Sequence, residues 1–396
     1  MELLNGYEVM EDDMNILYIV PAMYPYGWAY ASRALNITRL MCEAGHKVTV
    51  MCDYLSDGIE KKDNLKYEEA IVVISTGKYA SQRNLKDKLL VKHTMKKTLE
   101  EYLKNHKMDY ILCPMTGGKY SMVNRVANRY NLPIVLEICE WYSFKNWSFG
   151  RMDPRFWKFQ FDWKYIYPKA KRVLCISRLL EEKFTKKGVK VTRIPTILDT
   201  NSIPCKKSDD LHSPIKLVFI GGITGGKDEL STLIETICSN NLPFEINVYG
   251  PSETAVYNTL QESIINCRIF KERIHIHGFV DQQLIEKKIL DSDYGILIRP
   301  KRRSSHAGFP TKLGEYFSAG LPVIANDTGD ICLYLKNMEN GILLEDNDQA
   351  SILKALELIM HIGKEKYCEM SKWARRTSEN DFDYRKYIDN IEYLLR

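Results

Sequence analysis

The feature that most restricts the fold of this sequence is an alternation of short apolar runs with longer amphipathic stretches, which occurs twice along the chain. In the first half the apolar runs predict strands at 15–20, 48–52, 71–75, 110–114, 133–138 and 172–177. The stretches between them predict helices at 31–46, 85–106 and 119–130. Strands that alternate with helices in this way are typical of parallel βαβ units, with helices on both faces of a sheet.

The pattern stops at residues 199–214 and then restarts. This stretch is polar, contains proline and lacks periodicity, which suits a linker between domains. Further strands are predicted at 216–221, 244–250, 273–278, 294–300 and 321–327, and the amphipathic segment 381–396 predicts a closing helix. The expected fold is therefore α/β, with two Rossmann-like doubly wound domains that face each other across a cleft.

We predict five segments in chain order. They are an overhang at 1–13, a first Rossmann-like domain at 14–198, a linker at 199–214, a second Rossmann-like domain at 215–375 and a C-terminal helix at 376–396. A ligand is expected in the cleft, because sheets of this kind bind ligands at the carboxyl ends of their strands.

Composition places the chain among ordinary globular proteins, with 45% hydrophobic and 27% charged residues and no apolar run near the ~18 residues that span a bilayer. The acidic start lacks a secretory signal, which predicts a cytoplasmic protein. The ten cysteines show no CxxC spacing, so buried thiols are expected rather than a zinc or redox site. His275 and His277 share one strand face without nearby partner ligands, and no metal site is predicted.

Positive charge is concentrated in two segments, although the formal net charge is only +5. Residues 83–107 contain eight Lys or Arg against three Asp or Glu, and residues 151–172 contain seven against two, interleaved with seven aromatic residues. Each segment is either a solvated helix face or a surface that meets anionic lipid headgroups or an anionic acceptor, and both interpretations stay open. A nucleic-acid partner is not expected, because the pI of about 8.5 is below that of a dedicated binder.

A glycine-rich loop follows the first predicted strand of the second half, at residues 221–228. Its glycines allow backbone N–H groups to approach an anion, and Lys227 adds a mobile charge beside a helix N-terminus. The spacing Gly221-x4-Gly226-Lys227 nearly completes a Walker A loop, but Asp228 occupies the place of the Ser or Thr that holds Mg²⁺. A diphosphate cradle without metal is therefore favoured over a P-loop, with a simple glycine-rich turn as the alternative.

Two further loops, at 248–253 and 277–281, leave strands with glycine at their ends. In a domain that binds a nucleotide, Phe279 and Val280 would flank the base, although a plain strand-to-helix turn fits these residues equally well. The Asp-Ser-Asp at 291–293 has the spacing of a metal–diphosphate motif, but its position between a helix and a strand favours a capping role.

The segment 308–327 places charge at the mouth of a predicted helix. Pro310 or Thr311 can begin this helix, and Lys312 and Glu315, three residues apart, then share one face near its N-terminus. A lysine there opposes the helix dipole and so indicates a bound anion, while Glu315 could accept hydrogen bonds from vicinal hydroxyls such as those of a ribose. A surface ion pair is the alternative. Upstream basic residues are expected to make this mouth electropositive; they are Arg299, Lys301, Arg302 and Arg303.

Taken together, these motifs resemble a GT-B-fold glycosyltransferase of the retaining family 4, or group 1, type. The likeness runs through almost the whole chain, and the segments that carry it are 15–52, 132–143, 175–184, 194–200, 219–237, 277–280 and 310–325. The resemblance implies a UDP- or GDP-sugar donor, retention at the anomeric carbon, and no obligatory metal or other cofactor. It also implies that the first domain binds the acceptor, that the second binds the donor, and that the C-terminal helix crosses back to the first domain.

The resemblance assigns roles to individual residues. It implies that Lys227 binds the diphosphate, that Glu315 holds the ribose and that the backbone at Gly27 approaches the diphosphate. The predicted donor contacts are Gly27, Gly221, Gly222, Lys227, Tyr249, Gly250, Phe279, Val280, Lys312, Leu313 and Glu315. The predicted catalytic residues are Lys227, Lys312 and Glu140, with Glu137 as a second carboxylate to be tested.

Two departures from the family pattern concern the donor. The first Glu of the family's paired-Glu motif lies eight residues before the second, and Ala307 occupies that position here. The Arg that often follows the glycine of the donor half is also absent, with Ile223 and Thr224 nearby. We expect Lys312 or Arg299 to supply the missing charge.

The predicted function is transfer of a hexosyl or N-acetylhexosaminyl group from a nucleotide-diphosphate sugar, UDP in preference to GDP, to a hydroxyl of a glycan or lipid-linked acceptor. This fits bacterial surface polysaccharide or glycoconjugate synthesis by a cytoplasmic protein that is peripheral on the inner face of the membrane. A nucleotide-sugar epimerase and a non-catalytic nucleotide- or glycan-binding protein on the same scaffold are the alternatives.

Overall fold

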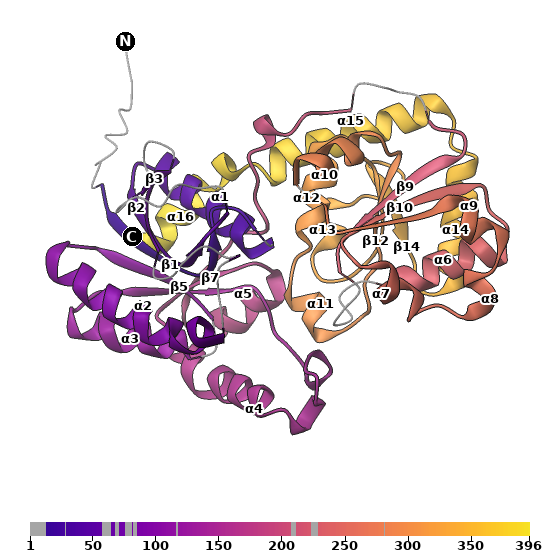
Figure 1. Cartoon of the computed structure of the whole chain (residues 1–396). Helices are drawn as coiled ribbons and strands as arrows, with labels where there is room; N and C mark the ends of the chain where they lie inside the picture. Colours follow the sequence, from indigo (N-terminus) through magenta and orange to yellow (C-terminus); the bar gives the residue numbers. More distant parts are fainter. Residues whose placement is uncertain are drawn as a thin grey trace, which may run out of the picture.

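The computed structural model describes residues 13–27, 29–57, 65–67, 71–75, 81, 85–115, 118–206, 211–222, 229–280 and 282–396. Two α/β domains lie side by side, each built around its own sheet (Figure 1). The first half of the chain, indigo to magenta, forms one domain, and the orange part of the second half forms the other. The yellow C-terminal segment reaches both domains. The predicted fold class is confirmed.

The first sheet has eight strands in the order β3-β4-β2-β1-β5-β6-β7-β8. Its strands are β1 (Asn15–Tyr24), β2 (Lys47–Leu55), β3 (Leu65–Tyr67), β4 (Ile71–Ser75), β5 (Tyr110–Pro114), β6 (Ile134–Ile138), β7 (Arg172–Cys175) and β8 (Lys190–Arg193). Neighbouring strands are parallel except β3 with β4. The central strand β1 is buried along Ile16 to Val20, as expected for a parallel sheet covered on both faces.

The described residues of the first domain include five α-helices. They are α1 (Ala29–Glu43), α2 (Leu85–Asn105), α3 (Lys119–Arg129), α4 (Pro154–Phe161) and α5 (Arg178–Thr185). Helix α4 begins at Pro154 because proline suits the first helical position and the Asp153 side chain accepts a hydrogen bond from the Arg155 N–H at 2.9 Å. The helix continues into a π-helical turn at Asp162–Ile166. Short 3₁₀ turns occur at Phe144–Asn146, Gly150–Met152, Tyr167–Lys169, Thr200–Ser202 and Tyr384–Tyr387.

The second sheet has six parallel strands in the order β11-β10-β9-β12-β13-β14. Its strands are β9 (Ile215–Ile220), β10 (Phe244–Tyr249), β11 (Ile274–Gly278), β12 (Tyr294–Leu297), β13 (Val323–Asn326) and β14 (Gly341–Leu344). Its helices are α6 (Leu230–Ser239), α7 (Glu253–Tyr257), α8 (Glu262–Ile265), α9 (Arg268–Arg273), α10 (Gln282–Leu290), α11 (Arg303–Ala307), α12 (Thr311–Ser318), α13 (Ile331–Tyr334) and α14 (Gln349–Met360). The strand order reverses between β9 and β12, and sheets of this kind bind ligands beside such a reversal.

The C-terminal segment was predicted to form one closing helix over 381–396. The boundaries of that prediction are wrong. Helix α15 (Lys364–Asp381) ends at the start of that range, and α16 (Ile388–Leu395) begins after a 3₁₀ turn. The break occurs because the backbone pairs with Leu198: the Leu198 N–H donates to the Phe382 carbonyl at 2.8 Å. Helix α16 then packs on β8, β7 and α1, so the predicted return to the first domain is confirmed.

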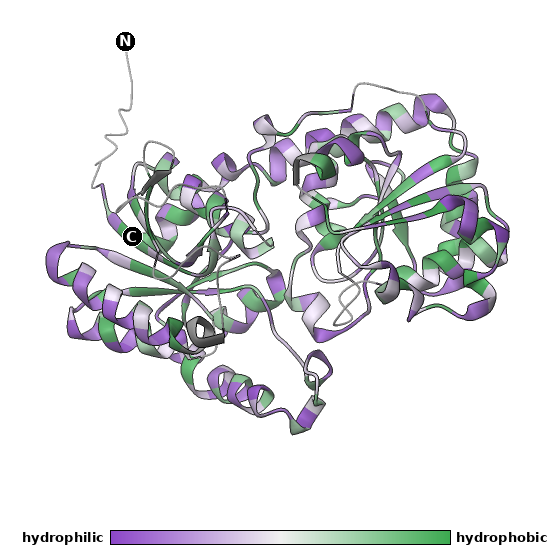
Figure 2. Cartoon of the chain, in the orientation of Figure 1, coloured by the Kyte–Doolittle hydropathy of each residue, from purple (hydrophilic) through white to green (hydrophobic). Residues whose placement is uncertain are grey.

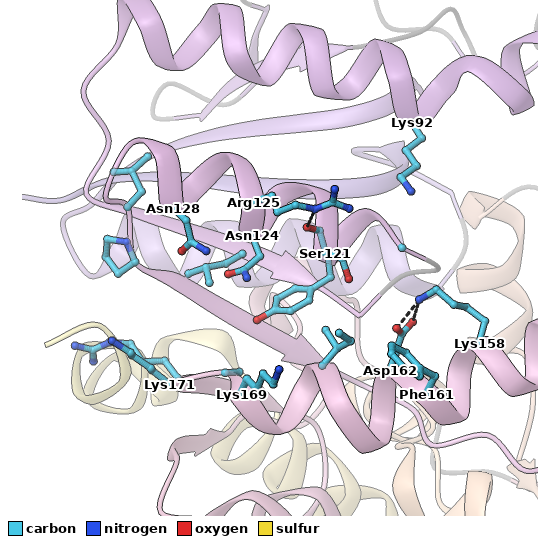
Figure 3. A pocket seen from close by; sticks show the side chains of 18 of the residues that line it. Lys92, Ser121, Asn124, Arg125, Asn128, Lys158, Phe161, Asp162, Lys169 and Lys171 are labelled. Carbon is cyan, nitrogen blue, oxygen red and sulfur yellow. Dashed lines mark hydrogen bonds and ion pairs between the residues drawn. The ribbon is translucent and has the colours of Figure 1, made fainter.

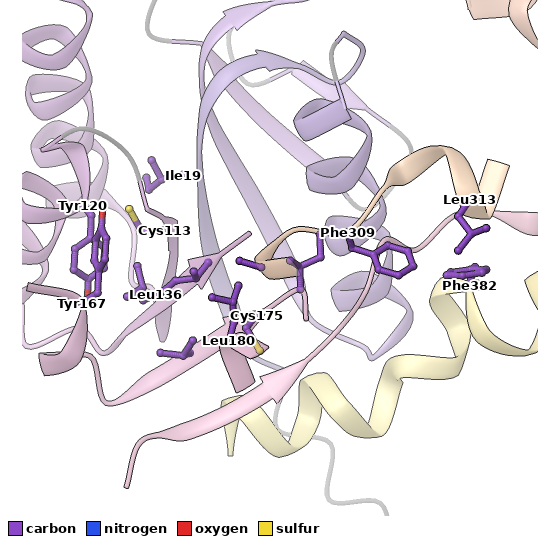
Figure 4. Packing of buried hydrophobic residues seen from close by; sticks show 14 of the residues in the cluster. Ile19, Cys113, Tyr120, Leu136, Tyr167, Cys175, Leu180, Phe309, Leu313 and Phe382 are labelled. Carbon is purple, nitrogen blue, oxygen red and sulfur yellow. The ribbon is translucent and has the colours of Figure 1, made fainter. Parts of the chain in front are cut away.

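Hydrophobic side chains join the two domains as well as filling each one. One buried cluster contains Leu136 and Cys175 of the first domain and Phe309 and Leu313 of the second (Figure 4). Phe382 lies in the same cluster, with its ring centroid 5.8 Å from that of Phe309. Figure 2 shows hydrophobic residues along the strands and hydrophilic ones on many outward helix faces. Among the described helices, none combines the length and apolar character needed to cross a membrane.

Candidate functional site

The candidate site begins where three neighbouring strands of the second sheet end. The Gly221 N–H, just after β9, donates to the Tyr249 carbonyl at 3.1 Å. The Gly250 N–H, just after β10, donates to the Gly278 carbonyl at 2.7 Å. Gly250 has a φ of +110°, and a Cβ at this position would clash with the Gly221 carbonyl oxygen. The close approach of two backbones therefore requires glycine at position 250.

A pair of stacked rings lies at these strand ends. His277 stacks on Tyr249 with ring centroids 4.5 Å apart and an interplanar angle of 8°, and His277 Nε2 lies 2.8 Å from Asn247 Oδ1. Desolvation, together with the positive charges of His275 and Lys288, lowers the pKa of His277. Burial raises the pKa of Tyr249 to about 12, so both rings are neutral near pH 7.

The predicted base-flanking residues differ in exposure. Phe279 is 88% exposed just after β11, whereas Val280 is half-buried against the cluster that joins the domains. The loop after Gly222 continues into residues 223–228, so Lys227 lies outside the described residues. The predicted roles of Phe279, Val280 and Lys227 stay predictions.

Helix α12 begins at Thr311 with Pro310 as its N-cap, and it places Lys312 and Glu315 on one face. Lys312 Nζ lies 2.6 Å from Glu315 Oε2, and 26% and 21% of the two side chains are exposed. The two predicted ligand contacts are therefore paired with each other, as the alternative interpretation expected. Because part of each side chain is exposed, both charges remain accessible to a ligand.

Two neighbours of Glu315 fix the position of α12. The Tyr316 hydroxyl accepts a hydrogen bond from the Ile220 N–H at 3.1 Å, which anchors α12 at the end of β9, one residue before Gly221. Leu313 is fully buried in the core between the domains, so only its backbone could face a ligand. The sequence motif includes Tyr316, but the sequence alone assigned no role to it.

A second carboxylate lies near Glu315. Burial, and then the charge of Glu315, raises the pKa of Glu286 in α10. This proximity brings α10 to the same end of the sheet as α12. Glu286 was not predicted as a site residue, because no short sequence spacing connects it with Glu315.

The basic residues expected to make this mouth electropositive are largely used for structure. Arg299 is buried, and its NH1 group donates to the Ser305 carbonyl at 3.4 Å. Lys301 pairs with Asp346 at 3.1 Å. Arg303 donates to the Tyr142 carbonyl of the first domain, and its guanidinium lies 4.8 Å from the centroid of the Trp141 ring. Arg299 therefore does not face the site as a free charge, and Arg303 serves the domain interface.

On the first domain, Glu137 at the carboxyl end of β6 is fully buried and fully engaged. Its Oε1 accepts from Arg33 Nε at 2.8 Å, and its Oε2 accepts from the hydroxyls of Tyr18 at 2.7 Å and Tyr30 at 2.9 Å. Burial and the charge of Glu137 raise the pKa of both tyrosines well above the usual range. This geometry suits a scaffold role for Glu137.

Glu140 lies three residues further on, in the segment that meets α11. There the Asn146 Nδ2 donates to Ser304 Oγ at 3.3 Å, and Ser177 Oγ donates to the Ala307 carbonyl at 2.7 Å. Glu140 is half-buried at this junction. The segment that carries Glu140 and the helix that carries Ala307 therefore meet at one interface between the domains.

Gly27 follows β1 and has a φ of +151°. A Cβ at this position would lie 2.5 Å from the Met23 side chain, so packing within the loop already requires glycine. The predicted approach of a diphosphate to Gly27 stays a prediction.

The Asp-Ser-Asp at 291–293 is structural. Asp293 is buried and accepts hydrogen bonds from Lys206 Nζ at 3.0 Å and from the Lys216 N–H at 2.8 Å, while Asp291 pairs with Lys216 Nζ at 3.4 Å. Within the described ranges, no group of three or more His, Cys, Asp or Glu is arranged to hold a metal ion. All ten cysteines are free thiols; Cys52, Cys113, Cys175 and Cys238 are buried, five are half-buried and Cys205 is exposed, so the prediction of buried thiols is confirmed for four of them.

Comparison with known proteins adds to this geometry. Residues 214–361 match the model of the family described as Glycosyl transferases group 1. Trehalose phosphorylase of Grifola frondosa is 36% identical over 72 residues, which is 18% of this chain and 10% of that protein, so the matched segment spans about a tenth of this curated relative.

Several solved structures resemble nearly the whole chain. Sucrose-phosphate synthase from Thermosynechococcus elongatus has a TM-score of 0.72 at 14% identity, over 96% of this chain and 97% of that one. Anabaena HepE in complex with UDP and glucose has a TM-score of 0.67 at 15% identity, over 96% and 98%. TarM has a TM-score of 0.70 at 11% identity, over 97% and 99%.

Two doubly wound domains with these structural neighbours define the GT-B class of fold. Within the chain, residues 214–361 of the second domain are similar to the family described as Glycosyl transferases group 1. The resemblance inferred from the sequence motifs is confirmed at this level.

Proposed function

We propose that this protein is a glycosyltransferase that moves a hexosyl or N-acetylhexosaminyl group from a nucleotide-diphosphate sugar to a hydroxyl group, with retention at the anomeric carbon. The observation that carries the proposal is the convergence of Gly221, Gly250 and α12 at one edge of a parallel sheet, in a domain that matches group 1 glycosyltransferases. UDP is proposed in preference to GDP, because Anabaena HepE, which has a similar fold, was solved with UDP and glucose.

The donor would lie across the ends of β9, β10 and β11, with its base beside Phe279 and Val280. Backbone N–H groups of Gly221 and Gly222 would then face the diphosphate. Binding would exchange the Lys312–Glu315 ion pair for two new contacts, one from Lys312 to a phosphate oxygen and one from the ribose hydroxyls to Glu315. The exchange costs little, since a partly exposed ion pair contributes about 0–1 kcal/mol.

The reaction breaks the bond between the anomeric carbon and the diphosphate oxygen and forms a bond from that carbon to the acceptor oxygen. In a front-face mechanism the departing diphosphate takes the proton of the acceptor hydroxyl, so no protein base is required. Negative charge grows on the leaving group, and Lys227, Lys312 and the backbone N–H donors would stabilise it. These donors make a metal or other cofactor unnecessary in the proposed mechanism.

Glu140 is the carboxylate that we assign to the sugar or the acceptor. A Cβ on Gly308 would lie 3.6 Å from the Cys139 carbonyl oxygen, so the segment that carries Glu140 touches the backbone next to Ala307. Glu140 would then contact sugar hydroxyls that the family's first Glu usually contacts. Glu137 is an unsuitable alternative, because it is fully buried and already accepts hydrogen bonds from the side chains of Arg33, Tyr18, Tyr30 and Cys139.

The acceptor is proposed to be a glycan or lipid-linked sugar in bacterial surface polysaccharide or glycoconjugate synthesis, at the cytoplasmic face of the membrane. We assign the acceptor to the first domain, residues 14–198, and the donor to the second domain, residues 215–375. Two alternatives remain on the same scaffold. An epimerase would act on the donor without an acceptor. A binding protein without catalytic activity would not hydrolyse the donor, whereas a glycosyltransferase is expected to hydrolyse it slowly when no acceptor is present.

A thermal-shift panel of UDP, GDP and their sugars tests the donor site. We expect UDP to raise the melting temperature of the parent protein, and Glu315→Ala to abolish this rise while leaving the melting temperature of the free protein nearly unchanged. The matched control is Glu369→Ala, which removes another i,i+3 Lys–Glu pair, Lys366–Glu369 at 3.1 Å on α15. If Glu315→Ala binds UDP as tightly as Glu369→Ala does, the proposed site is wrong.

A further inference from the structure

A groove of about 980 Å³ lies on the first domain (Figure 3), and none of the residues that line it belongs to the second domain. One wall is α3, which contributes Ser121, Asn124 and Arg125. The opposite wall runs from the end of α4 to the start of β7 and contributes Lys158 and Lys169. The mechanism proposed above uses none of these residues.

The groove is strongly basic. Its lining contains six cations and one carboxylate, Asp162, which is paired with Lys158. The cations are Lys92, Arg125, Lys158, Lys169, Lys171 and Arg172. Four of them, all except Lys158 and Arg172, are exposed and form no ion pair with any described residue. Like charges gathered around one concavity attract an anion.

Neutral hydrogen-bond donors add to these charges. Ser121, Asn124 and Asn128 on α3 face the groove across from Lys169 and Lys171 (Figure 3). Amide and hydroxyl groups donate to phosphate oxygens, and lysines bind phosphate as point charges. The lining therefore suits phosphate groups in particular.

An exposed aromatic stripe borders the groove. Trp157, Phe161 and Tyr165, each four residues apart along α4 and the π-helical turn, are 60%, 51% and 46% exposed, and Phe161 itself lines the groove. The opposite face of the same segment is buried through Phe156, Phe159, Trp163 and Tyr167. Phe149 and Met152 are also exposed just before α4, so five of the twelve exposed large hydrophobic side chains of the described chain lie within residues 149–165.

We propose that this groove and stripe seat the first domain on an anionic phospholipid bilayer, with headgroup phosphates in the groove and Trp157, Phe161 and Tyr165 in the interfacial layer. The proposal deepens the proposed function, on which it rests for the lipid-linked acceptor. Amphipathic aromatic rings favour the interface between headgroups and acyl chains. Each Lys or Arg near an anionic surface adds to the attraction between the protein and that surface.

The exposed hydrophobic side chains beside the groove favour a bilayer surface, rather than a free anion, as its binding partner. A free phosphate or an anionic glycan in the groove would leave Phe149 and Met152 in water, since neither side chain offers a polar group to a sugar. A bilayer surface buries these side chains and neutralises the lysines at the same time. The acceptor's lipid would then lie in the same plane as the protein.

Vesicle co-sedimentation tests the proposal. We expect the full-length protein to bind vesicles of phosphatidylglycerol and phosphatidylcholine, to bind pure phosphatidylcholine far less, and to release as salt increases. Lys169→Glu with Lys171→Glu, and separately Trp157→Ala with Phe161→Ala, should each weaken binding tenfold or more. All four residues are exposed, so the melting temperatures of these variants should stay close to that of the parent protein.

The matched controls are Lys372→Glu and Trp373→Ala, two exposed residues on α15 of the second domain. Both controls should bind vesicles like the parent. Equal binding by groove variants and controls, or absence of binding by the parent, would overturn the proposal. So would release of vesicles by millimolar inorganic phosphate alone, which would identify a site for free phosphate. Thermal stabilisation by UDP is measured on the same samples. If UDP stabilises the protein but vesicles do not bind, the membrane proposal alone is wrong; if UDP does not stabilise it, the proposed function is wrong.

Discussion

Two carboxylates, Glu137 in the first domain and Glu315 in the second, have contrasting surroundings. Glu137 is fully buried and accepts hydrogen bonds from four side chains, including Arg33. Glu315 is partly exposed, and among the described residues its ion pair is with Lys312, at 2.6 Å. A saturated carboxylate holds the scaffold, whereas a carboxylate with one exchangeable partner can bind a ligand.

The energies of the two sites differ for the same reason. Removing one partner of a buried, hydrogen-bonded ion pair leaves an uncompensated charge in a low-dielectric environment, which costs about 3–5 kcal/mol. Removing one partner of a partly exposed pair on a helix costs about 0.2–0.5 kcal/mol. The first site should therefore report on folding, and the second on ligand binding.

The largest expected effect comes from Glu137→Gln compared with Glu315→Gln. The first substitution keeps the shape of the side chain but leaves the Arg33 guanidinium without its counter-charge, and we expect it to lower the free energy of unfolding by about 3–5 kcal/mol. The second should lower it by less than about 1 kcal/mol. Urea denaturation of both variants, followed by circular dichroism, measures the difference. Similar stabilities for the two variants would remove the basis of the comparison.

Backbone geometry rather than buried charge shapes the proposed donor site, and Gly250→Ala tests this. The substitution places a Cβ against the Gly221 carbonyl oxygen at a φ of +110°, and strain of this kind costs about 1–3 kcal/mol. The loop should shift, so we also expect UDP stabilisation to be lost. Melting curves with and without UDP measure both effects.

The control for Gly250→Ala is Gly188→Ala. Gly188 also has a positive φ, +69°, but a Cβ there would have no neighbour within 4 Å. The Gly188→Ala variant therefore measures the cost of a positive φ for alanine alone, without a clash against neighbouring backbone. Equal losses of stability in both variants, with UDP binding intact in Gly250→Ala, would show that the close approach of the two backbones is unimportant.

Most strands were predictable, because each is a short apolar run between polar turns. The short strands β3, β8 and β14 were not predicted, because β3 and β8 have little apolar character and β14, although apolar, is only four residues long. The closing helix was predicted as continuous over 381–396, and its break depends on pairing of Phe382 with Leu198, nearly two hundred residues away. Sequence periodicity contains no information about such a contact.

The candidate site shows the same limit. The helix start at Thr311 and the glycine at 250 follow from local rules, and both lie where the motifs place them. The use of Arg299 and Arg303 for structure could not be predicted, because the partners of these residues, Ser305 and Tyr142, are set by tertiary packing. The network around Glu137 likewise joins residues from β1, α1 and β6 that are more than a hundred positions apart.

The smallest expected effect concerns pH. Because the pKa of His277 in the folded protein is lowered from its usual value near 6.5, the unfolded chain binds more protons below about pH 6.5, and stability should fall as the pH drops through this value. His277→Gln should remove this part of the pH dependence, an effect on the order of 0.5 kcal/mol or less because the ring is largely exposed.

Urea midpoints of the parent and His277→Gln at pH 5 and pH 8 measure this effect. The parent should lose more stability between pH 8 and pH 5 than the variant does. Since Gln can still donate to Asn247 Oδ1, the stacked position beside Tyr249 should be retained, and stability at pH 8 should be nearly equal in the two proteins. If the variant loses more stability between pH 8 and pH 5 than the parent does, protonation of His277 stabilises the strand ends. A positive charge would then contribute to the stability of this part of the second domain.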